Sequence, residues 1–550
     1  MDGSDIVKRP STRRSAAAAP ALRPGQIGTI TEVTGFKLRC IVHADPAADT
    51  VEHSYASAQI GSLVKIPTPR SIAYGFIESL TFQKPESDAP LAFAEIDLLG
   101  EKMNTTDRSP GKFMRGISIY PVLGAPLFCA EAEDIALIYA KPNTWVLPIG
   151  SLFQDSEMPA YLMSQEFLSK HSAIVGTTGS GKSCALTLIL RTLLTHHPNG
   201  HVVMFDPHGE YTTAFTDLGE RITPDTMQLP YWLFSFEEIV EILCSRDPIA
   251  RSHEAPILKD IILAAKQDFL GDAAKGAALT VDTPTPYRIT SVIQRISDAM
   301  GKLDRPDSSQ PYLRLITTIE NLRKDRRYRF MFEGLAVRDS MADVISRILR
   351  IPVDGKPITI LDISAVPSEI VNVVVSALTR LIFDFNLWSE REEAIPILLV
   401  CDEAHRYIPR DGEQAFEPTR RSIARIAKEG RKYGVSLCLV TQRPAELSES
   451  ILSQCSTIFA LRMNNERDQK FVRSMLPDDG AGLLSVLPTL RQREAIVVGE
   501  GVAHPMRIRF NDLDDKFRPK GEAANFPEAW QDDTNGRDFV TKIVQRWREQ

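Results

Sequence analysis

The chain has 550 residues, of which 25% are charged and 43% apolar, and its formal net charge is −7. This length exceeds what one hydrophobic core usually organises, so we expect two or more folding units. The acidic balance argues against a protein that coats nucleic acid nonspecifically, although a local basic surface remains compatible with it. The sequence shows no run with the length of a membrane span and no signal-peptide core, so we expect a cytoplasmic protein without a membrane partner.

The first part of the chain predicts a small all-β domain. Residues 1–22 are polar and basic and are expected to form a disordered tail. Short strand patterns separated by Gly, Pro, Asp and Ser follow, which predicts an N-terminal antiparallel β-barrel over residues 23–145. No catalytic motif is visible there. The expected strands are residues 28–33, 37–42, 63–66, 72–77, 91–96 and 117–120.

From residue 146 to about 515, apolar strands alternate with helices. The continuous apolar runs suit a mostly parallel α/β sheet buried on both faces. Between about 236 and 350 the strands stop and apolar residues recur at helical spacing, which predicts a helical insertion. Residues 516–550 are polar and are expected to form an arm or brace with a helix around 537–548. The strands expected in the sheet are residues 172–175, 201–206, 358–363, 396–401, 435–440, 456–461 and 495–498.

A phosphate-binding motif follows the first of these sheet strands. Residues 176–183 read Gly-Thr-Thr-Gly-Ser-Gly-Lys-Ser and precede a helical pattern. This is a P-loop, whose glycines turn backbone N–H groups toward phosphates at a helix N-terminus. We expect Lys182 to reach the terminal phosphates and Ser183 to bind Mg²⁺. The predicted nucleotide-binding residues are Gly176, Thr177, Thr178, Gly179, Ser180, Gly181, Lys182, Ser183 and Cys184.

Hydrolysis also needs a metal holder and a group that orients the attacking water. The apolar run at residues 397–401 ends in Asp402 and Glu403, at the sheet edge where ligands bind in such folds. We expect Asp402 to hold Mg²⁺ through water and Glu403 to polarise the nucleophilic water. Residues 402–405 also spell the Asp-Glu-Ala-His helicase box. Because the other motifs of that helicase class are not evident, only the first two residues are assigned a role.

Residues 205–211, Phe-Asp-Pro-His-Gly-Glu-Tyr, contain the Asp-x-x-Gly spelling of a GTPase switch. The chain lacks an Asn-Lys-x-Asp motif, which recognises the guanine base in GTPases, so ATP is favoured over GTP. Two interpretations stay open here. Asp206 and Glu210 could face the γ-phosphate or a neighbouring subunit, or the segment could be a structural turn, because Asp, Pro and Gly are ordinary turn formers.

Two further polar residues are expected to act on the γ-phosphate. Gln442 follows the strand after Asp402 and would serve as a sensor. The helix before that strand, about residues 419–433, carries many cations, most of which fit a solvated face. We interpret Arg431, near its end, as an arginine finger that enters the neighbouring subunit's site. The alternatives for this role are Arg425 and Arg443.

Together these motifs resemble the HerA family of hexameric DNA-translocating ATPases, relatives of the FtsK and conjugative-transfer motors. The resemblance spans nearly the whole chain, from the barrel to the strand at 495–498. It implies a RecA-like ATPase core that uses ATP and Mg²⁺, a homohexameric ring, and sequence-independent binding of duplex DNA. It also implies a partner nuclease or other effector, NurA-like or sirtuin-type among them, in DNA end processing or antiphage defence.

A second class of function stays open, an ATP-gated ring scaffold that assembles and activates an effector without moving along DNA. An ABC-type or GTPase signalling module is disfavoured, because the chain has neither a Leu-Ser-Gly-Gly-Gln signature nor the Asn-Lys-x-Asp guanine-recognition motif. The DNA-contacting residues are not identified by any motif. The basic candidates, for which a solvated helix face is the alternative, are Arg323, Lys324, Arg326, Arg327 and Arg329.

Overall fold

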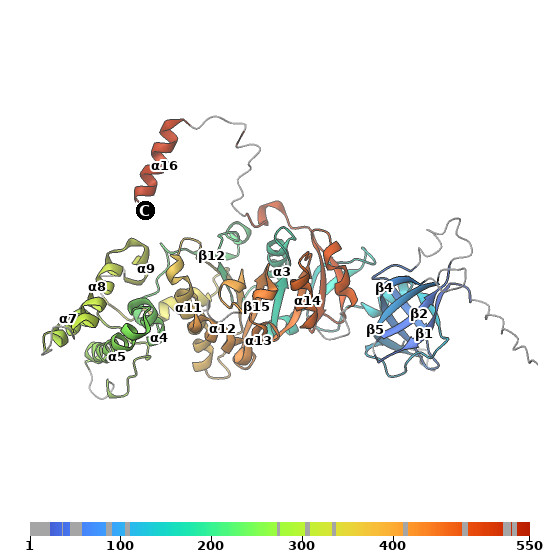
Figure 1. Ribbon diagram of the computed structural model, residues 1–550, viewed down its shortest axis with the longest axis horizontal. Helices are drawn as coiled ribbons and strands as arrows, with labels where there is room; N and C mark the ends of the chain where they lie inside the picture. Colours follow the sequence, from blue (N-terminus) through green and yellow to red (C-terminus); the bar gives the residue numbers. More distant parts are fainter. Residues whose placement is uncertain are drawn as a thin grey trace, which may run out of the picture. The chain divides into compact units, whose positions relative to one another are not determined.

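The computed structural model divides into two compact units, Met1–Leu137 and Ile138–Gln550 (Figure 1). The division comes earlier in the chain than the predicted boundary at residue 145. The expected tail at 1–22 lies outside the residues that the structure describes. These residues are 23–35, 37–44, 58–83, 91–104, 111–271, 276–302, 309–332, 337–410, 416–475, 482–520, 530 and 536–549.

The first unit is the expected antiparallel barrel, drawn in blue in Figure 1. Alternate residues such as Ile30, Cys40, Ile66 and Ile96 point inward and form one buried core. Pairing between β2 and β5 closes the ring of strands, and β6 (Phe113–Arg115) pairs with the outer part of β5. The order around the ring is β2 (Lys37–Val42), β1 (Gln26–Val33), β7 (Pro126–Cys129), β3 (Leu63–Pro67), β4 (Ser71–Gln83) and β5 (Leu91–Met103).

The predicted strand at residues 117–120 is wrong. Ser118 donates its backbone N–H to the carboxylate of Glu101 (2.8 Å), which is buried on the neighbouring β5. Because that N–H is used by a side chain, it cannot join a strand ladder. The hydrogen bonds to Ser118 also lower the pKa of Glu101 against the opposing effect of burial, so the carboxylate stays ionised within the barrel. The sequence prediction missed β6 and β7, which are short.

The second unit contains a mixed sheet in which every predicted strand is present. Six neighbouring pairs from β12 to β16 run parallel, and the remaining pairs are antiparallel. The sheet order is β12 (Gly219–Ile222), β13 (Ile358–Asp362), β11 (Val202–Asp206), β14 (Ile397–Cys401), β15 (Val435–Thr441), β10 (His171–Val175), β16 (Cys455–Leu461), β17 (Glu494–Gly499), β18 (Met506–Phe510), β8 (Val146–Leu152) and β9 (Pro159–Met163).

The strands that the sequence prediction missed, β12, β18, β8 and β9, lie toward the two ends of this sheet. Each of them has partly or fully exposed residues among buried ones, as in the alternating pattern of Met506–Phe510. The central strands, by contrast, are buried at every residue. A continuous apolar run is required only where both faces of a strand are covered, so the edge strands carry a weaker sequence signal.

The expected helical insertion is present and is drawn in green in Figure 1. Its core includes Lys266, whose amine donates to the carbonyls of Val281 (2.7 Å) and Thr283 (2.6 Å). The described helices of the insertion are α4 (Phe236–Leu243), α5 (Pro248–Leu270), α7 (Ile289–Met300), α8 (Gln310–Lys324), α9 (Arg329–Phe332) and α10 (Met341–Leu349).

Three helices of the second unit matter below, α3 (Lys182–His196), α11 (Ser368–Trp388) and α12 (Glu417–Glu429). In the described chain, α11 alone has the length and hydropathy of a membrane span, and 72% of the apolar stretch is buried within the protein. Arg380 in this helix pairs with the buried Glu238 (3.0 Å). This is the pattern of a core helix. A separate helix, α16 (Arg537–Glu549), occupies the position predicted near the C-terminus.

Candidate nucleotide site

The loop between β10 and α3 has the backbone shape of a phosphate cradle. Gly179 (φ 75°) and Gly181 (φ 101°) adopt left-handed conformations that other residues rarely take. Thr177 donates its backbone N–H (2.9 Å) and its hydroxyl (3.0 Å) to the carbonyl of Arg462, which follows β16. Because the loop is held by its neighbours, the N–H groups at the start of α3 are positioned before a phosphate arrives.

The strand order brings three motifs to one edge of the sheet. β15 lies between β14 and the P-loop strand β10, and all three run parallel. Val175 is opposite Thr441, and Cys401 is opposite Leu439. The residues that follow these strands therefore meet at the same carboxyl edge.

Lys182 lies among the acidic residues of this edge. Burial lowers the pKa of its amine, and the negative charges of Glu403, Asp402 and Glu210 oppose that effect. The amine also donates to the carbonyl of Thr177 (3.2 Å). The structure thus brings the predicted phosphate-binding lysine together with Glu403, the predicted catalytic carboxylate, and Asp402, the predicted Mg²⁺ ligand.

Asp402 is a buried carboxyl group in an acidic environment. Burial raises its pKa well above the usual range, and the charges of Glu403 and Asp206 raise it further. A bound cation would relieve this repulsion. The nearby donors, the hydroxyl of Ser183 and carboxylate oxygens, are the hard ligands that Mg²⁺ prefers, so the residues fit that metal.

The segment after β11 combines the two interpretations left open by the sequence. The carboxylate of Asp206 accepts hydrogen bonds from the backbone N–H groups of His208 (3.3 Å), Glu210 (3.2 Å) and Tyr211 (3.0 Å), so Asp206 caps the turn. Glu210 instead reaches the P-loop, where its carboxylate accepts a hydrogen bond from the hydroxyl of Ser183 (3.2 Å). Asp206 is therefore structural, and Glu210 faces the site of its own chain.

Gln442 lies against the P-loop, because its side-chain oxygen accepts a hydrogen bond from the hydroxyl of Thr178. This placement agrees with the sensor position expected from the sequence. Glu403 has a left-handed backbone conformation (φ 47°), which is uncommon for a residue with a side chain and is typical of strained functional positions. The sequence interpretation assigned no role to His405. The structure places its Nδ1 3.3 Å from Oε2 of Glu403.

Arg431 is not at this edge of its own chain. It lies in the single turn Gly430–Tyr433, just before β15 begins, whereas the P-loop and Gln442 lie beyond the strand ends. The side chain of Arg431 is exposed. Of the alternatives, Arg425 pairs with Asp384 (3.6 Å) and Arg443 pairs with Glu446 (3.1 Å).

Two arginines that the sequence interpretation missed lie near the end of the P-loop. Both Arg518 and Arg493 counteract the rise in pKa that burial causes at the Cys184 thiol. Arg518 belongs to a segment whose Lys520 donates a backbone N–H to the carbonyl of Glu210 (3.1 Å). These side chains follow no recognisable motif, so only the tertiary structure reveals them.

The basic candidates for DNA contact lie at the end of α8, in the turn after it and at the start of α9. Arg327 pairs with Asp325 (2.7 Å) and Glu369 (3.6 Å), and Lys324 pairs with Glu320 (3.9 Å). These ion pairs favour the interpretation of a solvated face for the two residues.

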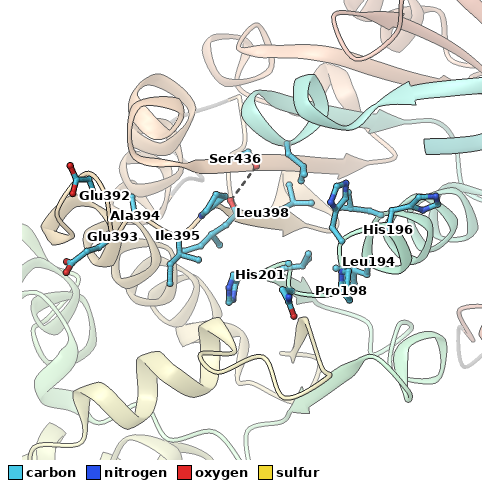
Figure 2. A pocket seen from close by; sticks show the side chains of 18 residues that line it. Leu194, His196, Pro198, His201, Glu392, Glu393, Ala394, Ile395, Leu398 and Ser436 are labelled. Carbon is cyan, nitrogen blue, oxygen red and sulfur yellow. Dashed lines mark hydrogen bonds between the residues drawn. The ribbon is translucent and has the colours of Figure 1, made fainter. Parts of the chain in front are cut away.

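A separate cavity of about 620 Å³ lies at the opposite, amino edge of the same sheet. Figure 2 shows Leu194, His201, Ile395 and Leu398 around it. Ser436 contributes from the start of β15 and donates its hydroxyl to the carbonyl of Ile397 (3.4 Å). Because β11 and β14 begin at this edge and end beside the P-loop, the cavity is distinct from the nucleotide site.

Comparison with known proteins gives the following similarities. Residues 147–382 match the family model described as the central domain of helicase HerA. The chain is 26% identical, over 75% of its length, to the DNA double-strand break repair helicase HerA of Sulfurisphaera tokodaii, 77% of which is covered. It is 27% identical, over 73% of its length, to the probable DNA double-strand break repair helicase HerA of Methanocaldococcus jannaschii, 82% of which is covered. Among solved structures, VirB4 of Thermoanaerobacter pseudethanolicus has a TM-score of 0.47 and 15% identity, over 68% of this chain and 98% of that chain.

Proposed function

This chain is a P-loop ATPase related to the HerA helicases, and on that basis we propose that it couples ATP hydrolysis to movement along duplex DNA. The resemblance expected from the motifs is confirmed by the family model and by the curated relatives. The observation that carries the proposal is the convergence of Lys182, Glu210, Asp402 and Glu403 at the carboxyl edge of one sheet. Such an edge is where parallel α/β sheets bind their ligands.

The residues of the site have distinct roles in this proposal. Lys182 binds the terminal phosphates of ATP. Ser183 and Asp402 would hold Mg²⁺, which would supply positive charge next to the phosphates. Glu403 accepts a hydrogen bond from the attacking water and orients it. Gln442 contacts the γ-phosphate from the end of β15, next to Thr178.

Arg431 completes the site only if a second copy supplies it. Its position at the amino end of β15 supports a role in the neighbouring subunit, because its own P-loop lies at the other end of the strand. We propose a homohexameric ring in which each Arg431 stabilises the transition state in the adjacent subunit. A ring of this kind would enclose duplex DNA and contact its phosphates without reading sequence.

The biological setting proposed here follows from the relatives. The named relatives are DNA double-strand break repair helicases. We propose that this protein acts in the cytoplasm with a separately encoded nuclease or other effector, NurA-like or sirtuin-type among them. DNA end processing and antiphage defence are the two settings that fit such a pair.

The test is the ATPase rate of the purified chain alone, with and without linear duplex DNA. A motor should hydrolyse ATP faster with DNA and should displace the third strand of a triplex. Lys182→Ala should abolish both activities, because the γ-phosphate loses its charge partner. ATP hydrolysis that ignores DNA and responds only to an effector would instead support the alternative, a ring scaffold that gates its partner.

DNA binding should depend weakly on sequence and strongly on salt. Contacts to phosphates release counterions, so the logarithm of the binding constant falls linearly with the logarithm of salt concentration. Fluorescence anisotropy with two unrelated duplexes over a series of salt concentrations measures both properties. Binding that stays constant across the salt series would contradict movement along the phosphate backbone.

A further inference from the structure

The carboxylate that is expected to orient water is incompletely satisfied. Among the residues that the structure describes, none donates a hydrogen bond to Oε2 of Glu403, although this atom is buried. The side chain is 13% exposed, and its backbone is held in the left-handed region. A buried carboxylate oxygen without a hydrogen bond costs free energy of folding. The neighbouring groups therefore determine whether this oxygen is available to accept a hydrogen bond from water.

His405 is the side chain placed to control this oxygen. Its Nδ1 lies 3.3 Å from Oε2 of Glu403 and 3.2 Å from Oγ1 of Thr441. Burial lowers the pKa of His405, with Glu403 and Glu446 opposing this and Arg443 and Arg406 adding to it. A neutral imidazole nitrogen either donates one proton or accepts one, so Nδ1 serves one of these partners at a time.

Thr441 connects this pair to the P-loop. Its hydroxyl is buried and accepts a hydrogen bond from the backbone N–H of Arg443 (3.0 Å), and its own proton remains available for His405. Its carbonyl accepts the N–H of Gly176, the first residue of the P-loop (3.4 Å). The next residue, Gln442, is the one that contacts Thr178 of the loop. A continuous series of contacts therefore runs from the phosphate cradle to Glu403.

We propose that His405 is a positioning residue that couples the P-loop to Glu403 through Thr441. In the tautomer with the ring proton on Nδ1, Nδ1 donates to Glu403 and the carboxylate is held in a resting arrangement. In the tautomer with that proton on Nε2, reached by proton exchange with water, Nδ1 accepts the proton of the Thr441 hydroxyl, and Oε2 of Glu403 is left free to orient water. A shift of the Thr441–Gln442 turn on nucleotide binding selects between the two arrangements. This inference rests on the proposed function, because it assigns Glu403 to the hydrolytic step.

Three variants of the full chain isolate this coupling. His405→Phe keeps a ring of similar volume but removes both nitrogens. His405→Asn restores a polar group close to the position of Nδ1. Thr441→Val keeps the shape of the threonine and removes its hydroxyl. The ATPase kcat and KM of each variant are measured with DNA, together with the affinity for a fluorescent ATP analogue and the melting temperature.

We expect His405→Phe to lower kcat about tenfold, which is the scale of one hydrogen bond to a charged group. KM and analogue affinity should stay within about twofold, because neither residue is expected to touch the nucleotide. His405→Asn should recover most of kcat. Thr441→Val should also lower kcat, and the double variant His405→Phe/Thr441→Val should be no slower than the slower single variant.

Several results overturn the inference. One is a wild-type kcat in His405→Phe, and another is an Asn variant as slow as the Phe variant. Effects of His405→Phe and Thr441→Val that multiply in the double variant would show that the two residues act independently. If His405→Phe does not fold, the comparison of Thr441→Val with the wild type still tests the proposal. The proposal requires the kcat of Thr441→Val to be lower than that of the wild type. A wild-type chain that does not hydrolyse ATP overturns the proposed function, and this inference with it.

Discussion

Arg431 provides the sharpest test of a shared active site, because its own chain cannot use it. β15 has seven residues between the turn that carries Arg431 and the edge that carries Gln442. At the usual rise of a strand this separates the two ends by roughly 20 Å, beyond the reach of one side chain. An arginine finger is worth roughly 10³-fold or more in rate. Arg431→Ala should therefore hydrolyse ATP very slowly while binding it normally and still forming rings.

Mixing this variant with Lys182→Ala gives a quantitative expectation. An interface is competent when the Arg431→Ala subunit supplies an intact Lys182 and the Lys182→Ala subunit supplies an intact Arg431. In rings assembled at random from equal amounts, about a quarter of the interfaces meet this condition, so about a quarter of the wild-type rate should return if interfaces act independently.

The matched control is a mixture of Lys182→Ala with Glu403→Gln. Lys182 and Glu403 belong to the same chain's half of the site. Every subunit in that mixture lacks either Lys182 or Glu403. No site therefore contains both groups, and no activity should return. Two affinity tags, purified in sequence, establish that the rings contain both variants. Mixed rings of Arg431→Ala and Lys182→Ala that remain as slow as either parent would refute the assignment and leave Arg425 or Arg443 to be tested.

Three further predictions use other parts of the molecule. Glu403→Gln should bind ATP but turn over at least about 100-fold more slowly, since the amide keeps the shape without the basic carboxylate; normal steady-state turnover would remove Glu403 from the mechanism. Burial lowers the pKa of Lys266 to about 8 from 10.5, so the unfolded chain binds more protons between these values. The free energy of unfolding should rise with pH there by up to about 3 kcal/mol in the wild type but not in Lys266→Met, as measured by urea denaturation, and equal rises would contradict the assignment. Gly430→Ala should lower the melting temperature, with a cost of about 1–3 kcal/mol or more, because its Cβ would lie 2.3 Å from the carbonyl oxygen of Val435. In the control Gly301→Ala the nearest atom to the new Cβ would be the carbonyl oxygen of Ser297 at 3.5 Å, so this variant should melt like the wild type.

The sequence by itself determined the elements whose signal is local. The P-loop is eight consecutive residues between a strand and a helix, and the central strands are continuous apolar runs because both of their faces are buried. The barrel and the helical insertion follow from their periodicity in the same way. For these parts the composition of a short window contains the physical reason for the structure.

The tertiary structure decided every contact between distant segments. Thr178 and Gln442 are 264 positions apart and meet only because β15 is inserted between β14 and β10. A carboxylate from a neighbouring strand took the N–H of Ser118 and removed a predicted strand. The contact between His405 and Glu403 is close in sequence, yet it depends on the left-handed backbone at Glu403 and on Thr441 from β15. Sequence periodicity specifies which face of an element is buried, whereas the order of strands specifies which side chains share an edge, and the chemistry of this site lies at that edge.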